Sequence, residues 1–174
     1  MDAAHFVLGA YLGWLWCFAR IVVRAPSGRQ RLNVLGALDA ISHQLLTVSN
    51  DSYINALSVC ELLAKIAALG LQTPITVVMD NARYQRCRLV LEKAACLGIE
   101  LLFLPPYSPN PNLIERLWRF VRKECLYSKY YEHFEPFKQA ITQCLAETRG
   151  QHQAALARLL TLEFQTFESA SRDL

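Results

Sequence analysis

An acidic residue, Asp80, stands directly after the apolar run Ile75–Met79, which is typical of a strand buried on both faces. Such a carboxylate lies at the carboxyl end of its strand, where open α/β sheets place their ligand sites. Carboxylate oxygens are also the ligands that hard cations such as Mg²⁺ prefer. A turn or a helix cap at Asp80-Asn81 is the ordinary alternative, and the strand position alone favours that alternative.

A second candidate, Glu115, falls one turn into a predicted helix. Asn110 is a favourable cap and Pro111 a favourable first residue, so we expect the helix to begin there. Its apolar residues form one core-facing stripe, at positions 114, 117, 118, 121 and 125. Because Glu115 flanks this stripe, its carboxylate can reach the edge of a sheet. The alternative is an exposed pair with Arg119 at i+4, which contributes only about 0.3–0.5 kcal/mol.

The elements that would position these residues follow from apolar periodicity and turn signals. Predicted strands lie within 11–23 and at 31–40, 44–48, 75–79 and 99–104. Predicted helices cover 53–69, 84–97, a segment from 111 onward, 136–150 and 152–167, with a helix-start signal at 49–52. Gly70 and Gly98 are expected to end the helices before them. Strands 75–79 and 99–104 with the helix between them form a β-α-β unit, which predicts a parallel pair.

The residues around both acids follow one compact pattern. The chain reads Asp80-Asn81-Ala82 after the strand, and residues 106–115 read Pro-Tyr-Ser-Pro-Asn-Pro-Asn-Leu-Ile-Glu, with Trp118 shortly after. This resembles the catalytic domain of DDE transposases, specifically the bacterial insertion-sequence branch related to mariner elements. In that family Asp-Asn-Ala is followed by Pro-Tyr-Ser-Pro-x-x-Asn-x-Ile-Glu and then by a Trp. The resemblance extends loosely over residues 1 to 135.

The resemblance implies an α/β, ribonuclease H-like fold, in which a mixed sheet is flanked by helices. The family's first acid sits in an apolar strand, and Asp2-Ala3-Ala4-His5-Phe6 matches the run around it, so Asp2 is the candidate. Because the family's strand begins several residues before this acid, we expect the first strand to be truncated here. Helix-turn-helix DNA-binding modules precede it in the family. Residues 1–174 are therefore expected to form a single catalytic domain without them.

The resemblance also implies a reaction. Asp2, Asp80 and Glu115 would hold two Mg²⁺ ions, for which Mn²⁺ can substitute, and two such ions stabilise both oxygens of an in-line displacement at phosphorus. The implied reactions are nicking at the ends of a mobile element and attack of the freed 3′-hydroxyl on target DNA. Implied partners are the transposon ends, the target DNA and a second copy of the chain. The implied location is the bacterial cytoplasm, at the nucleoid.

Basic residues follow both acids in the sequence. Phosphate contacts with DNA are expected from Arg83, Arg86, Arg116, Arg119, Arg122 and Lys123. Arginine outnumbers lysine 13 to 5, and arginine suits bidentate phosphate contacts. For any single basic residue, a solvated helix face is an equally good interpretation. Of the other candidates, we expect His5 to be structural and Trp118, which lies on the apolar stripe, to belong to the core.

Composition excludes several classes. A chain that is 53% hydrophobic and 19% charged is not disordered. Six cysteines without a Cys-x-x-Cys pair predict neither a zinc site nor a disulfide framework. The apolar run Phe6–Ala19 is interrupted by Arg20 and Arg24 before it reaches the length of a membrane span, so no membrane segment is expected.

Two alternatives to a transposase stay open. One is a plain metal-dependent nuclease of the same fold. The other is a truncated remnant that folds and binds DNA or partner subunits without catalysis, and the expected truncation of the first strand favours it.

Overall fold

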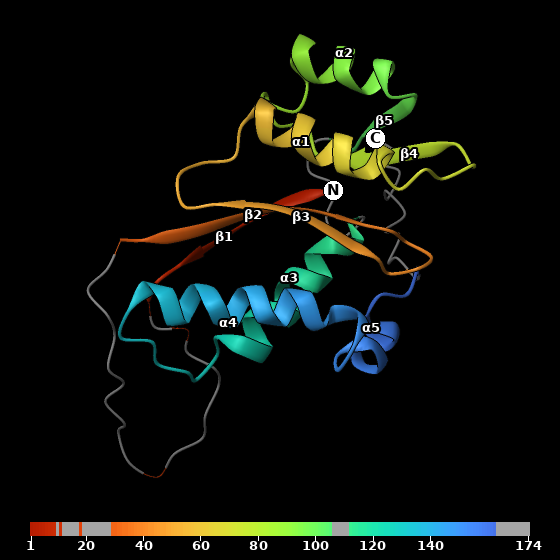
Figure 1. Ribbon diagram of the computed structural model, residues 1–174. Helices are drawn as coiled ribbons and strands as arrows, with labels where there is room; N and C mark the ends of the chain where they lie inside the picture. The colour runs from red at the N-terminus through yellow and green to blue at the C-terminus, as the bar shows by residue number, and fades with distance from the viewer. Residues whose placement is uncertain (10, 12–17, 19–28, 106–111, 163–174) are drawn as a thin grey trace, which may run out of the picture.

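The computed structural model describes residues 1–9, 11, 18, 29–105 and 112–162, and it contains both strands and helices (Figure 1). In chain order they are β1 (Asp2–Val7), β2 (Arg31–Leu38), β3 (Leu45–Asn50), α1 (Ala56–Ala67), β4 (Ile75–Met79), α2 (Arg88–Cys96), β5 (Ile99–Phe103), α3 (Leu113–Cys125), α4 (Phe134–Ala146), the short 3-10 helix η1 (Glu147–Arg149) and α5 (Gln153–Leu159). None of the helices described is both long and apolar enough to cross a membrane.

The strands form a mixed arrangement. β1, β2 and β3 are antiparallel neighbours, with Asp2 opposite Gly36, whereas β4 and β5 are parallel. The main-chain nitrogen of Met1 donates to the carbonyl of Val78 at 2.6 Å, which places the beginning of β1 beside β4. The three-stranded sheet β1-β2-β3 and the two-stranded sheet β4-β5 therefore meet where Met1 contacts β4.

Helices cover both faces of the strands, with α1 and α2 on one side and α3, α4 and α5 on the other (Figure 1). Side chains of β1 and β2 alternate between these layers because successive residues of a strand point to opposite faces. Ala4, Phe6 and Val34 pack with α3 and α4. Leu35 packs with α1 and with the apolar side chains of β4. Strand β2 is thus buried on both faces, and the α/β class expected from the sequence is confirmed.

The β4-α2-β5 unit agrees most closely with the sequence. Its strands are parallel as predicted, and β4 has the predicted bounds. Gly70 and Gly98 follow the helices that they were expected to end, with φ of +63° and +66°, a region that glycine adopts without steric cost. Helix α2 begins at Arg88, four residues later than predicted, because the chain first forms a turn in which the Gln85 nitrogen donates to the Ala82 carbonyl at 2.9 Å.

Two further helix starts, those of α1 and α4, differ from the sequence prediction. Helix α1 begins at Ala56 because Asn55 caps it, accepting from the Ser58 nitrogen at 3.1 Å, and not at the helix-start signal at 49–52. Helix α4 begins at Phe134, two residues before the predicted start. The described part of α3 begins at Leu113 with Asn112 at its cap position. The predicted strands within 11–23, the Asn110-Pro111 start and the chain beyond 162 lie wholly or mostly outside the described residues.

Candidate functional site

The first predicted acid, Asp2, opens β1 and is half-buried. It lies on the same face of the strand as Ala4 and Phe6, toward α3. The indole Nε1 of Trp118 donates to its Oδ2 atom at 3.1 Å. Burial raises the pKa of this carboxyl, and the negative charges of Asp80 and Glu115 raise it further, while a hydrogen bond from the Ala3 backbone acts in the opposite direction. The charges of Asp80 and Glu115 therefore both act on the carboxyl of Asp2.

The second acid, Asp80, is exposed and directly follows β4, as predicted. The loop that carries it is tied to the end of the neighbouring strand, because the Asn81 side chain donates to the Leu104 carbonyl and the Leu104 nitrogen donates to the Met79 carbonyl at 2.8 Å. Tyr84 lies four residues after Asp80, in the turn before α2. Burial raises the pKa of its phenol, and the charges of Asp80 and Asp2 raise it further.

The third acid, Glu115, is exposed in the first turn of α3. The start of this helix is fixed to β1, since the buried side chain of Asn112 donates to the Met1 carbonyl at 3.4 Å. Glu115 stands one turn before Trp118, the residue that contacts Asp2. The packing of α3 against β1 therefore brings the third acid to the first.

The chemistry of this acidic group suits a hard divalent cation. A half-buried carboxylate near two other acidic charges gains a favourable partner when such a cation binds beside it. Among the residues that the structure describes, no group of three or more His, Cys, Asp or Glu side chains is arranged to hold a metal ion. Mg²⁺ is commonly held by one or two carboxylates, with substrate oxygens and water completing its octahedron, so an open arrangement fits it.

The predicted DNA-contacting residues fall into two groups. Three of them contact other parts of the chain. Arg116 donates to the carbonyls of Leu159 and Thr161 at 3.3 and 2.9 Å, Arg86 lies 5.4 Å from the ring centre of Phe103, and Arg122 lies 5.5 Å from that of Phe6. The other three have exposed side chains: Arg83, Arg119 and Lys123. Contact with DNA stays a prediction for all six.

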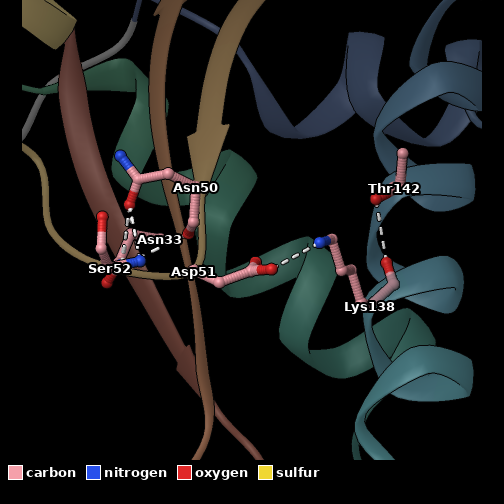
Figure 2. Close-up of polar contacts among 6 residues, drawn as sticks. All are labelled: Asn33, Asn50, Asp51, Ser52, Lys138 and Thr142. Carbon is pink, nitrogen blue, oxygen red and sulfur yellow. Dashed lines mark hydrogen bonds and ion pairs between the residues drawn. The ribbon is translucent and has the colours of Figure 1, made fainter.

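Two further titratable residues, His5 and Asp51, make contacts that give them structural roles. His5 lies on the opposite face of β1 from Asp2, and its Nδ1 is 2.7 Å from Oδ1 of the buried Asn33, so the structural interpretation of His5 is confirmed. Figure 2 shows Asn33 beside Asn50, to whose Oδ1 it donates at 3.2 Å. Asp51 belongs to the predicted helix-start signal, but it pairs with Lys138 of α4 at 2.7 Å (Figure 2).

Sequence reasoning missed two members of the site. Trp118 is buried in the core as predicted, with 2% of its surface exposed, but its hydrogen bond to Asp2 was not anticipated. The chemistry of tryptophan could have indicated this bond, because a buried indole N–H needs a hydrogen-bond acceptor. Tyr84 was missed because a single aromatic residue in a predicted helix carries no signal that separates it from core packing.

The burial of Asp2, together with the charges of Asp80 and Glu115, predicts that Asp2→Asn stabilises the metal-free domain at pH 7. A raised pKa in the folded state means that the charged carboxylate of Asp2 opposes folding. This penalty is absent below the pKa that Asp2 has in the unfolded chain. It grows as the pH rises from there through the higher pKa that Asp2 has in the folded chain. The melting temperatures of the two proteins in EDTA should therefore differ at pH 7 and converge in acid. An unmodified chain that melts higher at pH 7 would contradict the repulsion.

Comparison with known proteins is consistent with this geometry. Residues 13–138 match the family described as DDE superfamily endonuclease. The search of curated proteins gave no significant match. Among solved structures, a pre-cleavage Mos1 transpososome is 13% identical with a TM-score of 0.62, over 96% of this chain and 56% of that chain. The Mos1 transposase paired-end complex with the left transposon end is 12% identical with a TM-score of 0.60, over 93% and 55%.

The catalytic domain of Mos1 mariner transposase is 14% identical with a TM-score of 0.50, over 83% of this chain and 80% of that one. Identities this low show the fold alone, and that fold is the ribonuclease H-like one predicted from the sequence. The chain spans about half the length of the transposase chains in the two complexes. Because the family match covers most of its 174 residues, this chain belongs to the DDE superfamily of endonucleases.

Proposed function

We propose that this chain is the catalytic domain of a DNA transposase from the bacterial insertion-sequence branch related to mariner elements. It cuts DNA strands at the ends of the element and joins the freed 3′-hydroxyl to target DNA. Asp2, Asp80 and Glu115 are its three metal ligands. The proposal is supported by the contacts that join the three segments. Met1, next to Asp2, donates to Val78 two residues before Asp80, and Trp118, three residues after Glu115, donates to Asp2.

The proposed cofactor is a pair of Mg²⁺ ions, or Mn²⁺ in their place. When bound, such ions stabilise the attacking and leaving oxygens of an in-line displacement at phosphorus. Two Mos1 structures, one described with Mn and one catalytic domain with Mg, support this choice of metal by analogy of fold. The exposed carboxylates of Asp80 and Glu115 leave room for a DNA phosphate beside them, whereas Asp2 is fixed from the core side by Trp118.

The chain's own residues then orient the DNA. Arg119 and Lys123 lie one and two turns after Glu115 on α3, and Arg83 lies three residues after Asp80. Their exposed charges can contact phosphates without reading base sequence. Arg86, Arg116 and Arg122, whose intrachain contacts fix them in place, would contribute charge at the rim of the same surface. The Mos1 paired-end complex with the left transposon end supports DNA as the partner. A homodimer is the proposed active assembly.

The proposal is tested by a calorimetric Mn²⁺ titration of the unmodified chain beside Asp2→Asn, Asp80→Asn and a control, Glu124→Gln. Glu124 is an exposed acid at the other end of α3 from Glu115. Weaker binding in both aspartate variants, with binding unchanged in the control, is the expected result. Binding that does not depend on Asp2 would remove it from the site, and absence of binding in the unmodified chain would reject the proposed metal centre.

A second candidate function is a non-catalytic protein of the same fold that binds DNA or partner subunits. It is favoured by one observation, namely that no group of three or more His, Cys, Asp or Glu side chains within the described residues is arranged to hold a metal ion. The same titration separates the two candidates, because a non-catalytic remnant has no reason to bind Mn²⁺ through Asp2 and Asp80. A plain nuclease would share the metal site and would differ in failing to join a 3′-hydroxyl to a second DNA molecule.

A further inference from the structure

We propose that Trp118 is a positioning residue for Asp2, whose carboxylate it holds in one orientation relative to Asp80 and Glu115. The inference rests on the proposed function, since it assigns to Trp118 the support of the first metal ligand. Its basis is the hydrogen bond of 3.1 Å from the indole Nε1 to Oδ2 of Asp2. A residue that acts through a ligand in this way commonly sets both the geometry and the affinity of a metal site.

Both the donor, Trp118, and the acceptor, Asp2, need this hydrogen bond. Trp118 is 2% exposed, so its N–H cannot be satisfied by bulk water, and an indole nitrogen donates but cannot accept. Asp2 is half-buried and accepts from this donor and from the Ala3 backbone. A hydrogen bond to an ionised carboxylate is stronger than one between neutral groups. Each partner therefore limits where the other can lie.

The indole ring has little freedom to move. It packs against Gly36, the residue opposite Asp2 on β2, so closely that a Cβ there would lie 2.8 Å from Cη2 of Trp118 and 2.9 Å from Cζ2. Phe6, on the same face of β1, makes an edge contact with the ring at 6.3 Å between ring centres. Because Gly36 has no side chain, the indole ring can pack against its backbone, and in this position the ring nitrogen donates to Asp2.

The same contact sets the distance between two of the acids. Trp118 and Glu115 are one turn apart on α3, and Asn112, at the start of that helix, donates to the Met1 carbonyl. Helix α3 is therefore attached to the first residues of β1 at two places, on either side of Glu115. A shift of the indole would move Asp2 and Glu115 relative to each other, which a two-ion site does not tolerate.

The test compares Trp118→Phe with Phe137→Leu. Trp118→Phe keeps an aromatic ring in the core but removes the N–H donor, whereas Phe137 is a fully buried member of the same core without a hydrogen-bonding group. Calorimetric Mn²⁺ affinity is expected to fall about 10–100-fold in Trp118→Phe, the usual effect of removing such a supporting contact. Phe137→Leu is expected to lower the melting temperature without changing the affinity. Equal affinity in Trp118→Phe and the unmodified chain would overturn the inference.

A second measurement requires no metal. The chain has three tryptophans, so the ¹⁵N–¹H indole resonance of Trp118 is identified as the one that Trp118→Phe lacks. Asp2→Ala is expected to shift this resonance because it removes the acceptor, and an unshifted resonance would overturn the inference. Loss of Mn²⁺ binding in Asp80→Asn but not in Trp118→Phe would reject the role of Trp118 alone. Absence of Mn²⁺ binding in the unmodified chain would reject the proposed function, and with it any role of Trp118 at a metal site.

Discussion

Asp80→Asn and Glu115→Gln are each expected to reduce DNA strand cleavage by about a thousandfold or more while the domain stays folded. Each change replaces a proposed, charged metal ligand with a neutral amide of nearly the same shape. Stabilisation of developing charge by metal ions contributes several kcal/mol to such reactions, and about 4 kcal/mol corresponds to about a thousandfold in rate. The loss should appear in the rate of cleavage under saturating DNA, because the ligands act on the reacting phosphate.

The fold should tolerate both changes because neither side chain is part of the core. Asp80 and Glu115 are exposed, and they flank the packed residues of β4 and α3. Glu115→Gln removes a favourable charge from the first turn of a helix, which costs about 0.3–1 kcal/mol. A small decrease in melting temperature is therefore consistent with an intact domain.

Cleavage is measured as nicking of a supercoiled plasmid in Mn²⁺, and folding by circular dichroism of the same samples. Glu124→Gln is the matched control, since it removes an exposed acid from the opposite end of α3. Its nicking rate should equal that of the unmodified chain. Full nicking by either Asp80→Asn or Glu115→Gln would reject the triad. Equal loss in all three variants would mean that total negative charge, and not the proposed site, determines the rate.

Local sequence signals predicted the parts of the fold that depend on neighbouring residues. The β4-α2-β5 unit was predictable because its strands are continuous apolar runs and because Gly98 ends the helix between them. Asp80 and Glu115 were singled out for a different reason, since their places in the elements alone favoured a turn and an exposed ion pair, and the motif shared with DDE transposases made them candidates. The start of α1 was misplaced because several residues near it can cap a helix, and tertiary packing selects Asn55 among them.

Contacts between distant segments could not be predicted in the same way. Trp118 donates to a residue 116 positions away, and Lys138 pairs with Asp51 across 87 positions. Periodicity placed Trp118 correctly in the core, but it contains no information about the acceptor of the indole N–H. The contacts of Arg116 were unpredictable for the same reason. The sequence does not distinguish a helical arginine that contacts DNA from one that donates to the carbonyls of Leu159 and Thr161.

Trp118→Ala is expected to destabilise the domain by about 3–5 kcal/mol, the usual cost of truncating a large buried aromatic residue. The ring fills the space between α3 and the central strands, in contact with Phe6 and against the bare backbone of Gly36. Removing it leaves a cavity that a glycine cannot fill, and it also removes the donor to Asp2. Since a typical domain is stable by only about 5–15 kcal/mol, this one change removes a large fraction of the total.

Urea denaturation followed by circular dichroism measures the effect, with Trp118→Phe as the comparison. The phenylalanine variant should lose less stability than the alanine variant, because it keeps most of the buried apolar area, although both lose the hydrogen bond. If Trp118→Ala instead weakened DNA binding at unchanged stability, the indole would be a contact for the substrate and not part of the core. The burial of Trp118 argues against that result, since a ring that is 2% exposed cannot stack on a base unless α3 first moves away from β1.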